Sequence, residues 1–260
     1  MKTNDLSYYS HKSKSDYYIN EAGRRNRWEH LYPSVQYYLD KVDFSGESFL
    51  EVGCAAGGMY EILDAKCGNV QYTGMEISQA EVDFAKKAYP NATFCCGNFY
   101  ENDFADASFD TVTAFMVVNH QERYRDFIAQ LLRVARKRVI FDARIQYDYP
   151  TVVDLQTSYL YYHGSGERNY FIPFNFYELF NYLHLAEFNA KKISVYGYYT
   201  PNKSSAFIQM PKSKLIAGAF CIEKYEPGTK VERWGGRPET AEHDWVEHIV
   251  ELPDFSMKDI

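Results

Sequence analysis

The chain has 260 residues, 46% of them hydrophobic and 24% charged, which suits one larger globular domain with a sizeable core. Its formal charge of −7 disfavours a nucleic-acid partner, because an acidic surface repels a phosphate backbone. No apolar run reaches the roughly 18 to 20 residues that span a bilayer, and the N-terminus is polar. We therefore expect a cytoplasmic protein without a signal peptide or a membrane partner.

Strand-like and helix-like segments alternate along the first part of the chain. The predicted strands are 48–52, 70–77, 92–96, 109–118 and 138–143, and the predicted helices are 59–65, 78–89 and 123–136. This alternation predicts an α/β fold whose parallel sheet is covered by helices on both faces. In such sheets ligands bind beyond the carboxyl ends of the strands.

The start of the second helix carries a capping-box pattern. Ser78 is expected to accept a hydrogen bond from a first-turn amide, and Glu81 to reach back to the backbone of Ser78. A helix should therefore begin after Ser78 and stop before Pro90.

The alternation breaks at a tyrosine-rich insertion, residues 144–173. An uninterrupted loop of that length is usually functional or carries structure of its own. Asn175 and Glu178 then give a start signal for a helix over 176–185. Two β-rich runs close the domain, at 192–199 and 215–224, and the role of the tail 225–260 is left open.

A turn of small residues follows the first strand, in the stretch FLEVGCAAGG at 49–58. Small residues let a ligand approach the backbone and leave helix N-terminal amides free. The spacing from Gly53 to Gly58 also fits a dinucleotide signature with alanine as its middle residue, which is a weak signal alone. Glu51 favours another ligand, because a carboxylate at this place can balance a cationic amino group.

Polar residues also end the second and third strands. Glu76 can accept hydrogen bonds from two ribose hydroxyls, which suits either ligand. Asn98 can accept from an adenine amine while Phe99 covers the ring, although an ordinary turn at Gly97 and Asn98 is left open.

Together these segments resemble the motifs of the class I S-adenosylmethionine-dependent methyltransferases. LEVGCAAGG resembles their first motif with Ala55 replacing a glycine, YTGMEIS their ribose motif, CGNFYE their adenine motif, and SFDTVTAFMVVNH their fourth strand and loop. The resemblance covers about 45–224. It implies a Rossmann-like, doubly wound, seven-stranded sheet, mostly parallel, whose antiparallel last strand lies beside the fifth, and S-adenosyl-L-methionine as cofactor.

The resemblance also divides the chain. Residues 1–44 would form an N-terminal helical lid, 45–224 the cofactor-binding domain with 144–173 capping the substrate, and 225–260 a C-terminal tail. For the lid, a helix that merely caps the sheet is left open. The implied cofactor-binding residues are Glu51, Gly53, Cys54, Gly57, Glu76, Ile77, Asn98, Phe99, Tyr18 and Trp28.

His120, just beyond the fourth strand, is the candidate catalytic residue. An alcohol needs a base before it can attack a methyl group, and imidazole, with an ordinary pKa near 6.5, suits that task. An amine or a carboxylate would need none, and a histidine that bonds the backbone or lines the cofactor site is left open. Among carboxylates beyond the fourth strand only Asp142 is well placed, so no catalytic metal is expected.

The acceptor pocket is expected where the insertion and the late strand ends meet. The candidate substrate-binding residues are Asp142, Arg144, Tyr147, Tyr161, Tyr162, His163, Arg168, Asn202 and Lys203. A structural ion pair is left open for Asp142 and Arg144, and core packing for many of the tyrosines.

Flat tyrosine faces with polar tips suit a sugar or a nucleotide-linked sugar, so the leading hypothesis is O-methylation of such a small molecule. Methylation of an amine or an aromatic metabolite, an NAD-dependent oxidoreductase, a non-catalytic interaction module and a homodimer are left open.

Overall fold

The structure is a computed structural model. It describes residues 12–20, 25–161, 168–185, 188–199, 206–208, 215–229, 233–234, 237–238 and 247–250.

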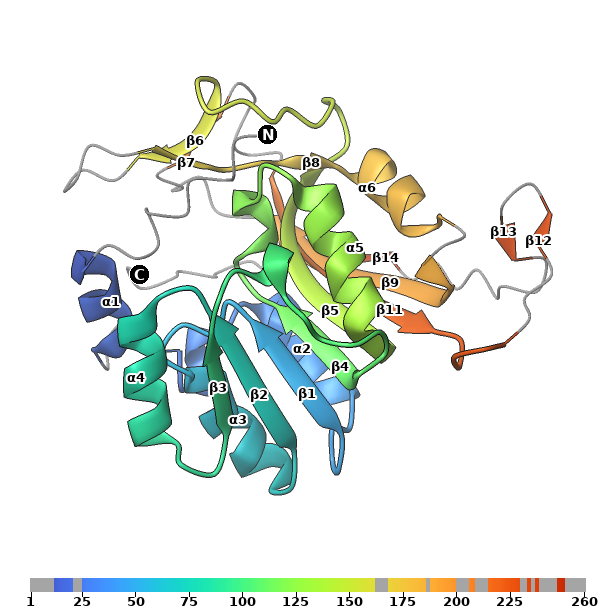
Figure 1. Cartoon of the computed structure of the whole chain (residues 1–260). Helices are drawn as coiled ribbons and strands as arrows, with labels where there is room; N and C mark the ends of the chain where they lie inside the picture. The colour runs from blue at the N-terminus through green and yellow to red at the C-terminus, as the bar shows by residue number, and fades with distance from the viewer. Residues whose placement is uncertain are drawn as a thin grey trace.

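A large mixed sheet occupies the centre of the molecule (Figure 1). Its strand order is β14-β9-β11-β5-β4-β1-β2-β3, and the short β8 pairs with β5. The strands are β1 Ser48–Val52, β2 Gln71–Glu76, β3 Thr93–Cys96, β4 Phe109–Ala114, β5 Ala135–Gln146, β8 Phe174–Asn175, β9 Ala190–Tyr199, β11 Ile216–Lys224 and β14 Glu247–Val250.

All pairings in this sheet are parallel except those of β11, which runs antiparallel to both β5 and β9. The predicted α/β class and the antiparallel last strand beside the fifth are thus confirmed. The sheet is larger than predicted, because β8 adds to β5 and β14, from the tail 225–260, adds to β9.

Helices cover both faces of the sheet (Figure 1). They are α1 Lys12–Ile19, α2 Pro33–Lys41, α3 Gly58–Cys67, α4 Gln79–Ala88, α5 Tyr124–Val134 and α6 Phe176–Leu183, with the 3₁₀ turns η1 Trp28–His30, η2 Phe99–Glu101 and η3 Val118–His120. None of the helices that the structure describes combines the length and apolar character that a membrane crossing needs.

Strand alternation divides the core into two layers. Leu50 and Val52 of β1 pack into the cluster that contains α5 and α6, whereas Phe49 packs into the cluster that contains α2, α3 and α4. Because successive side chains of a strand point to opposite faces, Glu51 lies on the same face as Phe49. Glu51 therefore ends up beneath the turn that leads into α3.

Helix starts show which sequence signals were decisive. The Asn175 side chain accepts hydrogen bonds from the backbone of Tyr177 and Glu178, which confirms the predicted start of α6. At α4, Ser78 is the N-cap residue, but its side chain makes no capping hydrogen bond, so that half of the predicted capping box is wrong. Glu81 is buried, and its predicted bond to the backbone of Ser78 stays a prediction.

The insertion carries structure of its own. β6 Ser158–Tyr161 pairs with β7 Arg168–Tyr170 and with β10 Ala206–Ile208, forming a three-stranded sheet beside the large one. A separate two-stranded sheet joins β12 Arg233–Trp234 to β13 Arg237–Pro238.

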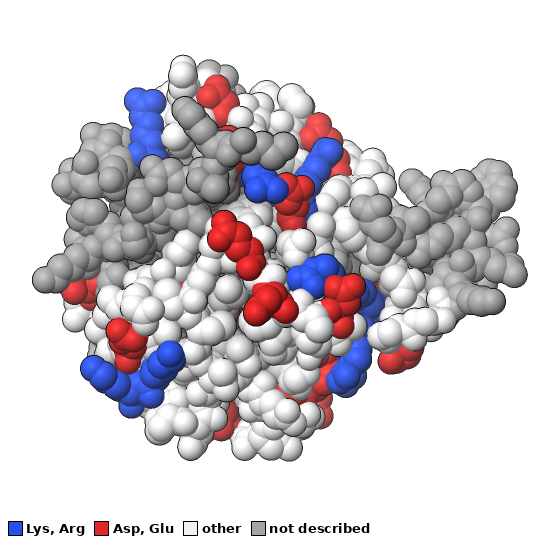
Figure 2. Space-filling model, in the orientation of Figure 1, with Lys and Arg blue, Asp and Glu red and all other residues white. Residues whose placement is uncertain are grey.

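On the face of the molecule shown in Figure 2, the described acidic and basic side chains are interspersed and do not gather by sign. A cluster of opposite charges lies at the amino ends of β1 and β4, where Glu47 and Asp110 pair with basic side chains of β5.

Candidate active site

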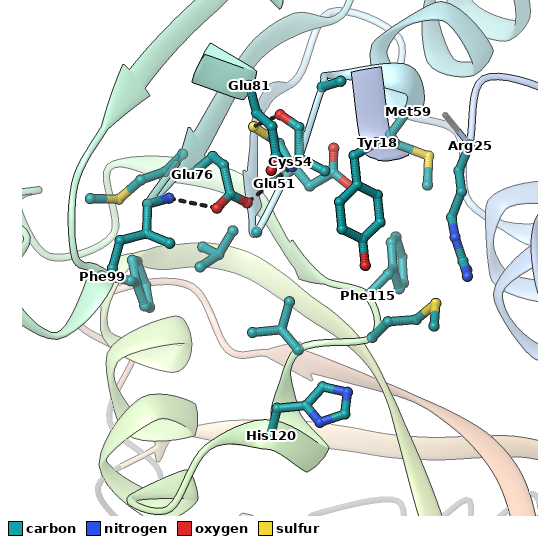
Figure 3. Close-up of a pocket in the computed structure, with 18 of the residues that line it drawn as sticks. Tyr18, Arg25, Glu51, Cys54, Met59, Glu76, Glu81, Phe99, Phe115 and His120 are labelled. Atoms are coloured by element: carbon teal, nitrogen blue, oxygen red, sulfur yellow. Dashed lines mark hydrogen bonds between the residues drawn. The ribbon is translucent and has the colours of Figure 1, made fainter. Parts of the chain in front are cut away.

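A cavity of about 250 Å³ opens at the carboxyl ends of β1, β2 and β4 (Figure 3). Its walls come from the turn after β1, the ends of β2 and β3, the segment after β4, helix α1 and the β6–β7 hairpin. The lining residues that carry the following argument are Tyr18, Arg25, Glu51, Gly53, Glu76, Glu81, Asn98, Phe99, His120, Leu160 and Asn169.

The turn after β1 brings backbone to the cavity. Gly53 has φ +77°, and its N–H donates to the carbonyl of Met75 at 2.8 Å. A Cβ atom on Gly53 would lie 2.5 Å from Cγ2 of Val117, so only glycine fits this close approach. Gly57, with φ +79°, shapes the turn but does not line the cavity, whereas Cys54 does.

Glu51 is a buried carboxylate with no cationic partner among the described residues. Its side chain is 5% exposed and accepts a hydrogen bond from the hydroxyl of Tyr72. None of the salt bridges within the described residues includes it. Burial raises the pKa of Glu51 to about 8, and the bond from Tyr72 offsets only part of that rise. A cation that entered the cavity would therefore be attracted to this side chain.

Glu76 connects the turn to the end of β2. It accepts hydrogen bonds from the backbone N–H groups of Ala55 at 3.1 Å, Ile77 at 2.7 Å and Ser78 at 3.1 Å. Burial raises its pKa despite these bonds. A carboxylate offers about four acceptor positions, so these three bonds leave capacity for a ligand hydroxyl. The bond from Ser78 uses the same N–H that Glu81 was predicted to reach at the start of α4.

Glu81 is a site residue that the sequence analysis assigned to a different role. It lines the cavity from the first turn of α4 and is 3% exposed. Helical periodicity was the signal that could have placed it, because Glu81 shares the buried face of α4 with Val82 and Ala85.

The proposed adenine residues follow β3. Asn98 caps η2, since its side chain accepts from the N–H of Tyr100 at 3.1 Å. Phe99 is buried, and its ring lies 5.3 Å from the ring of Phe127. Both residues and Ile77 line the cavity. Asn98 thus has the turn role that was left open and also faces the ligand space.

The N-terminal segment contributes Tyr18 and Arg25 to the cavity wall (Figure 3). A Cβ atom on Gly58 would lie 2.8 Å from the carbonyl carbon of Arg25, so the absence of a side chain there lets this segment pack on α3. Trp28 lies outside the cavity lining, with the ammonium of Lys66 4.3 Å above its ring. Arg25 was not among the predicted site residues. It reaches the cavity because its backbone packs closely on Gly58.

His120 lies in η3 and faces the cavity (Figure 3). Its Nδ1 is 2.6 Å from the backbone carbonyl oxygen of Tyr170. A carbonyl oxygen can only accept, so Nδ1 carries the proton and donates. In the neutral ring Nε2 is then the atom that can take up a proton.

Asp142 and Arg144 support the cavity from behind and do not line it. Asp142 accepts a hydrogen bond from the N–H of Met116, a lining residue with φ +60°, and lies 3.6 Å from Nη1 of Arg144. Arg144 in turn stacks on Tyr32, with 4.6 Å between the guanidinium carbon and the ring centroid. The structural ion pair that the sequence left open is the arrangement observed.

The β6–β7 hairpin faces the cavity with an unexpected pair of residues. Leu160 and Asn169 lie opposite each other in the ladder, and both line the cavity. Arg168 does not line it and stacks on Tyr159, while Tyr147 packs against Phe176 at 5.4 Å. The remaining candidates, the side chain of Tyr161 and residues Tyr162, His163, Asn202 and Lys203, lie outside the described residues.

Comparison with known proteins places this geometry in context. Residues 50–141 match the family model described as "Methyltransferase domain". The phthiotriol/phenolphthiotriol dimycocerosates methyltransferase of Mycobacterium tuberculosis is 33% identical over 98 residues, 37% of this chain and 36% of that protein. The fatty-acid O-methyltransferase of Mycolicibacterium smegmatis is 29% identical over 140 residues, 51% of this chain and 49% of that protein. The chain thus spans half or less of the length of these curated relatives.

Solved structures share the fold at low sequence identity. A SAM-dependent methyltransferase from Methanosarcina mazei superposes with a TM-score of 0.53 at 19% identity, covering 75% of this chain and 99% of that chain. A magnesium protoporphyrin IX methyltransferase from Synechocystis, solved with bound SAM, gives a TM-score of 0.50 at 14% identity, covering 84% of this chain and 94% of that one. At these identities the likeness establishes the architecture.

Proposed function

This chain belongs to the class I S-adenosylmethionine-dependent methyltransferase family, and on that premise we propose that it methylates a small molecule. The observation that carries the proposal is a pair of carboxylates beside the small-residue turn, neither of which has a salt-bridge partner among the described residues. Glu51 and Glu76 lie where the turn after β1 meets the end of β2. A ligand that carries an ammonium group and hydroxyls matches this pair.

The described residues fit S-adenosyl-L-methionine group by group. Glu51 would hold the ammonium of its amino-acid end, and Arg25, the one Lys or Arg among the described lining residues, would hold the carboxylate. Glu76 would accept from a ribose hydroxyl, and Asn98 with Phe99 would receive the adenine. When bound, this cofactor supplies a sulfonium methyl group that an aligned nucleophile can take.

His120 would serve as general base for an oxygen acceptor. The Tyr170 carbonyl fixes the ring with its proton on Nδ1, so Nε2 can take the proton of an acceptor hydroxyl. The name of the Mycolicibacterium relative, a fatty-acid O-methyltransferase, is consistent with oxygen as the acceptor atom.

The finer hypothesis of a sugar or sugar-nucleotide acceptor depended on the residues of 144–173. Tyr147 and Arg168, whose side chains are described, do not line the cavity. They lend this acceptor no support, so the proposed substrate class is a small molecule with an oxygen nucleophile.

The cofactor assignment is tested by calorimetry. Glu76→Ala should weaken binding of S-adenosylmethionine by roughly 1.5 to 3 kcal/mol, because charge-assisted bonds to the ribose are lost. NAD is the control ligand and should bind more weakly than S-adenosylmethionine to the wild type. Tighter binding of NAD would favour an oxidoreductase, and binding of neither would favour an interaction module.

The base is tested by kinetics with an acceptor found by S-adenosylhomocysteine release from a metabolite panel. His120→Ala should lower kcat by about 10² to 10⁴, the usual contribution of a positioned base, without loss of cofactor affinity. Arg168→Gln is the matched control outside the cavity. Near-wild-type kcat in His120→Ala would instead indicate an acceptor, such as an amine or a carboxylate, that needs no base.

A further inference from the structure

The lining residues that the proposed cofactor contacts leave over include a set of apolar side chains. They come from the segment between η1 and α2, from α2, from α3, from the segment after β4 and from the hairpin. The residues are Leu31, Val35, Met59, Phe115, Met116 and Leu160. Figure 3 shows Met59 and Phe115 in this region, on the side of Tyr18 away from Phe99.

Charge excludes an anionic body from this region. Glu51, Glu76 and Glu81 all line the cavity, and Arg25 is the one Lys or Arg among the described lining residues. A diphosphate would therefore meet one basic side chain, Arg25, which the proposed cofactor contact already uses, and carboxyl groups that cannot stabilise its charge. This lack of cationic partners selects against nucleotide-linked sugars.

The register of the hairpin decides which of its side chains the acceptor meets. Leu160 pairs with Asn169, and both line the cavity. Strand neighbours point to the opposite face, where the guanidinium of Arg168 lies 4.2 Å from the ring centroid of Tyr159. The acceptor thus meets one apolar side chain and one amide, and the stacked arginine and tyrosine face away from it.

The hairpin is held firmly against the cavity. The N–H of Ile172 donates to the carbonyl of Asn119 at 2.9 Å, and Nδ1 of His120 donates to the carbonyl of Tyr170 at 2.6 Å. Leu160 packs against a small apolar cluster of Phe171 and Leu215. The hairpin residues of these contacts lie outside residues 50–141, the part of the chain that matches the family model. Their partners Asn119 and His120 lie inside it.

We propose that the acceptor is an apolar small molecule with a single polar group, and that the Leu160–Asn169 pair selects it. Leu160 contacts the apolar body. Asn169, one residue before the carbonyl that holds His120, hydrogen-bonds the polar group beside the base. This assignment of substrate class and specificity residues depends on the proposed function.

The test uses a neutral apolar dye, N-phenyl-1-naphthylamine, whose fluorescence rises on binding, with S-adenosylhomocysteine present at saturation. The wild type should bind the dye, and UDP-glucose should not displace it. Leu160→Asp should weaken dye binding at least tenfold, because it places a carboxylate among the apolar side chains that contact the dye. Asn169→Leu should strengthen dye binding two- to fivefold, since it extends that wall.

Arg168→Gln, on the opposite face of the same hairpin, is the matched control and should change dye affinity less than twofold. Calorimetry with S-adenosylhomocysteine checks every variant, and Leu160→Ala, expected to weaken the dye several-fold, replaces Leu160→Asp if the latter does not fold. Displacement by UDP-glucose, absence of dye binding, or a larger effect of Arg168→Gln than of the Leu160 variants would overturn the inference. Loss of cofactor binding in the wild type would overturn the proposed function instead.

Discussion

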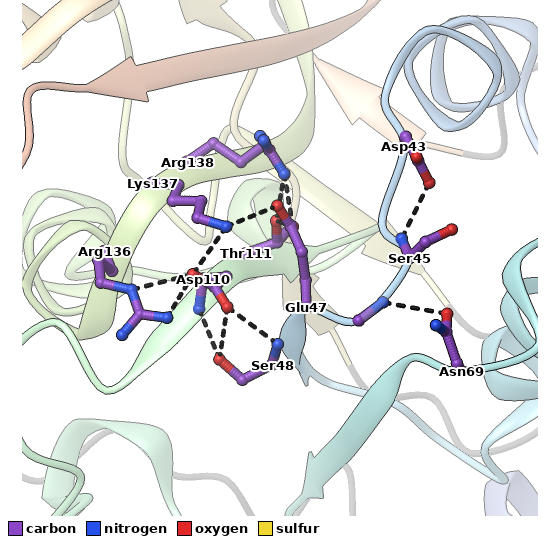
Figure 4. Close-up of polar contacts among 11 residues, drawn as sticks. Asp43, Ser45, Glu47, Ser48, Asn69, Asp110, Thr111, Arg136, Lys137 and Arg138 are labelled. Carbon is purple, nitrogen blue, oxygen red and sulfur yellow. Dashed lines mark hydrogen bonds and ion pairs between the residues drawn. The ribbon is translucent and has the colours of Figure 1, made fainter.

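Among the described residues, carboxylates lie at both ends of the strands of the large sheet, but only those at the amino ends have cationic side chains beside them. At the amino ends of β1 and β4, Glu47 and Asp110 lie among Arg136, Lys137 and Arg138 of β5 (Figure 4). At the carboxyl ends of β1 and β2, Glu51 has a tyrosine hydroxyl as its donor and Glu76 has backbone amides.

The pKa values express this difference. Asp110 and Glu51 are each 5% exposed. Burial alone would raise the pKa of Asp110, but bonds from Arg136, Ser48 and Lys137 outweigh it and lower the pKa to about 2. Burial raises the pKa of Glu51 to about 8. The opposite shifts separate a carboxylate whose cationic partners stabilise its charge from one that is more deeply desolvated and has no such partner among the described residues.

The largest expected effect is at the amino ends of the strands, where cationic side chains pair with the carboxylates. Arg138→Ala should lower the free energy of unfolding by about 3 kcal/mol, because buried Glu47 loses its closest cation. Affinity for S-adenosylmethionine should stay within twofold of the wild type. Chemical denaturation and calorimetry measure the two quantities, and a large loss of affinity with little loss of stability would reverse the comparison.

Glu51→Gln tests the carboxyl ends of the strands. Cofactor affinity should fall by about 2 kcal/mol, since an amide cannot balance the ammonium group, while the stability of the cofactor-free protein at pH 7 should rise. The stability rises because the raised pKa makes wild-type Glu51 take up a proton on folding at that pH, and the neutral amide avoids this cost. Glu51→Gln and Arg138→Ala should therefore have opposite signatures in the same two measurements.

The pH dependence of stability gives a third contrast. Glu51 binds a proton more tightly in the folded state, so its contribution is present below about pH 4.5 and is lost as pH rises through about 8. Between these limits the slope should reach about −1.4 kcal/mol per pH unit, and Glu51→Gln should remove it. Asp110 acts in the opposite direction, because its stabilisation is lost as pH falls from about 4 to about 2.

The same linkage predicts proton release on binding. The ammonium group of S-adenosylmethionine should lower the pKa of Glu51, so up to one proton leaves the wild type at pH 7. Calorimetry in buffers of different ionisation enthalpy measures this number. An equal release from Glu51→Gln would show that the proton comes from another group.

The smallest effect is expected for Tyr72→Phe. Its hydroxyl donates to Glu51 and lowers the pKa of that carboxyl, so its removal should raise the pKa further. Cofactor affinity at pH 7 should fall by about 1 kcal/mol and recover as the pH is raised, because more Glu51 is then ionised. Affinity that does not recover would separate Tyr72 from the ionisation of Glu51.

Local patterns in the sequence predicted most of the fold. The alternation of strands and helices, the start of α6 at Asn175 and the small-residue turn at Gly53 agree with the structure, since each depends on neighbours within a few residues. Glu51, Glu76, Asn98 and His120 were placed at the cavity for the same reason, because parallel strands end at one edge.

Tertiary contacts decided the remainder. The approach of Arg25 to Gly58 joins distant parts of the chain, and Glu81 faces the cavity because α4 packs with that side inward. In the insertion, a one-residue shift of register would exchange Leu160 and Asn169 for the tyrosine and arginine face. The sequence by itself determined the strand ends that form the cavity. Only long-range pairing decided which side chains of the hairpin line it, because strand register depends on contacts between segments and not on the residues of one segment alone.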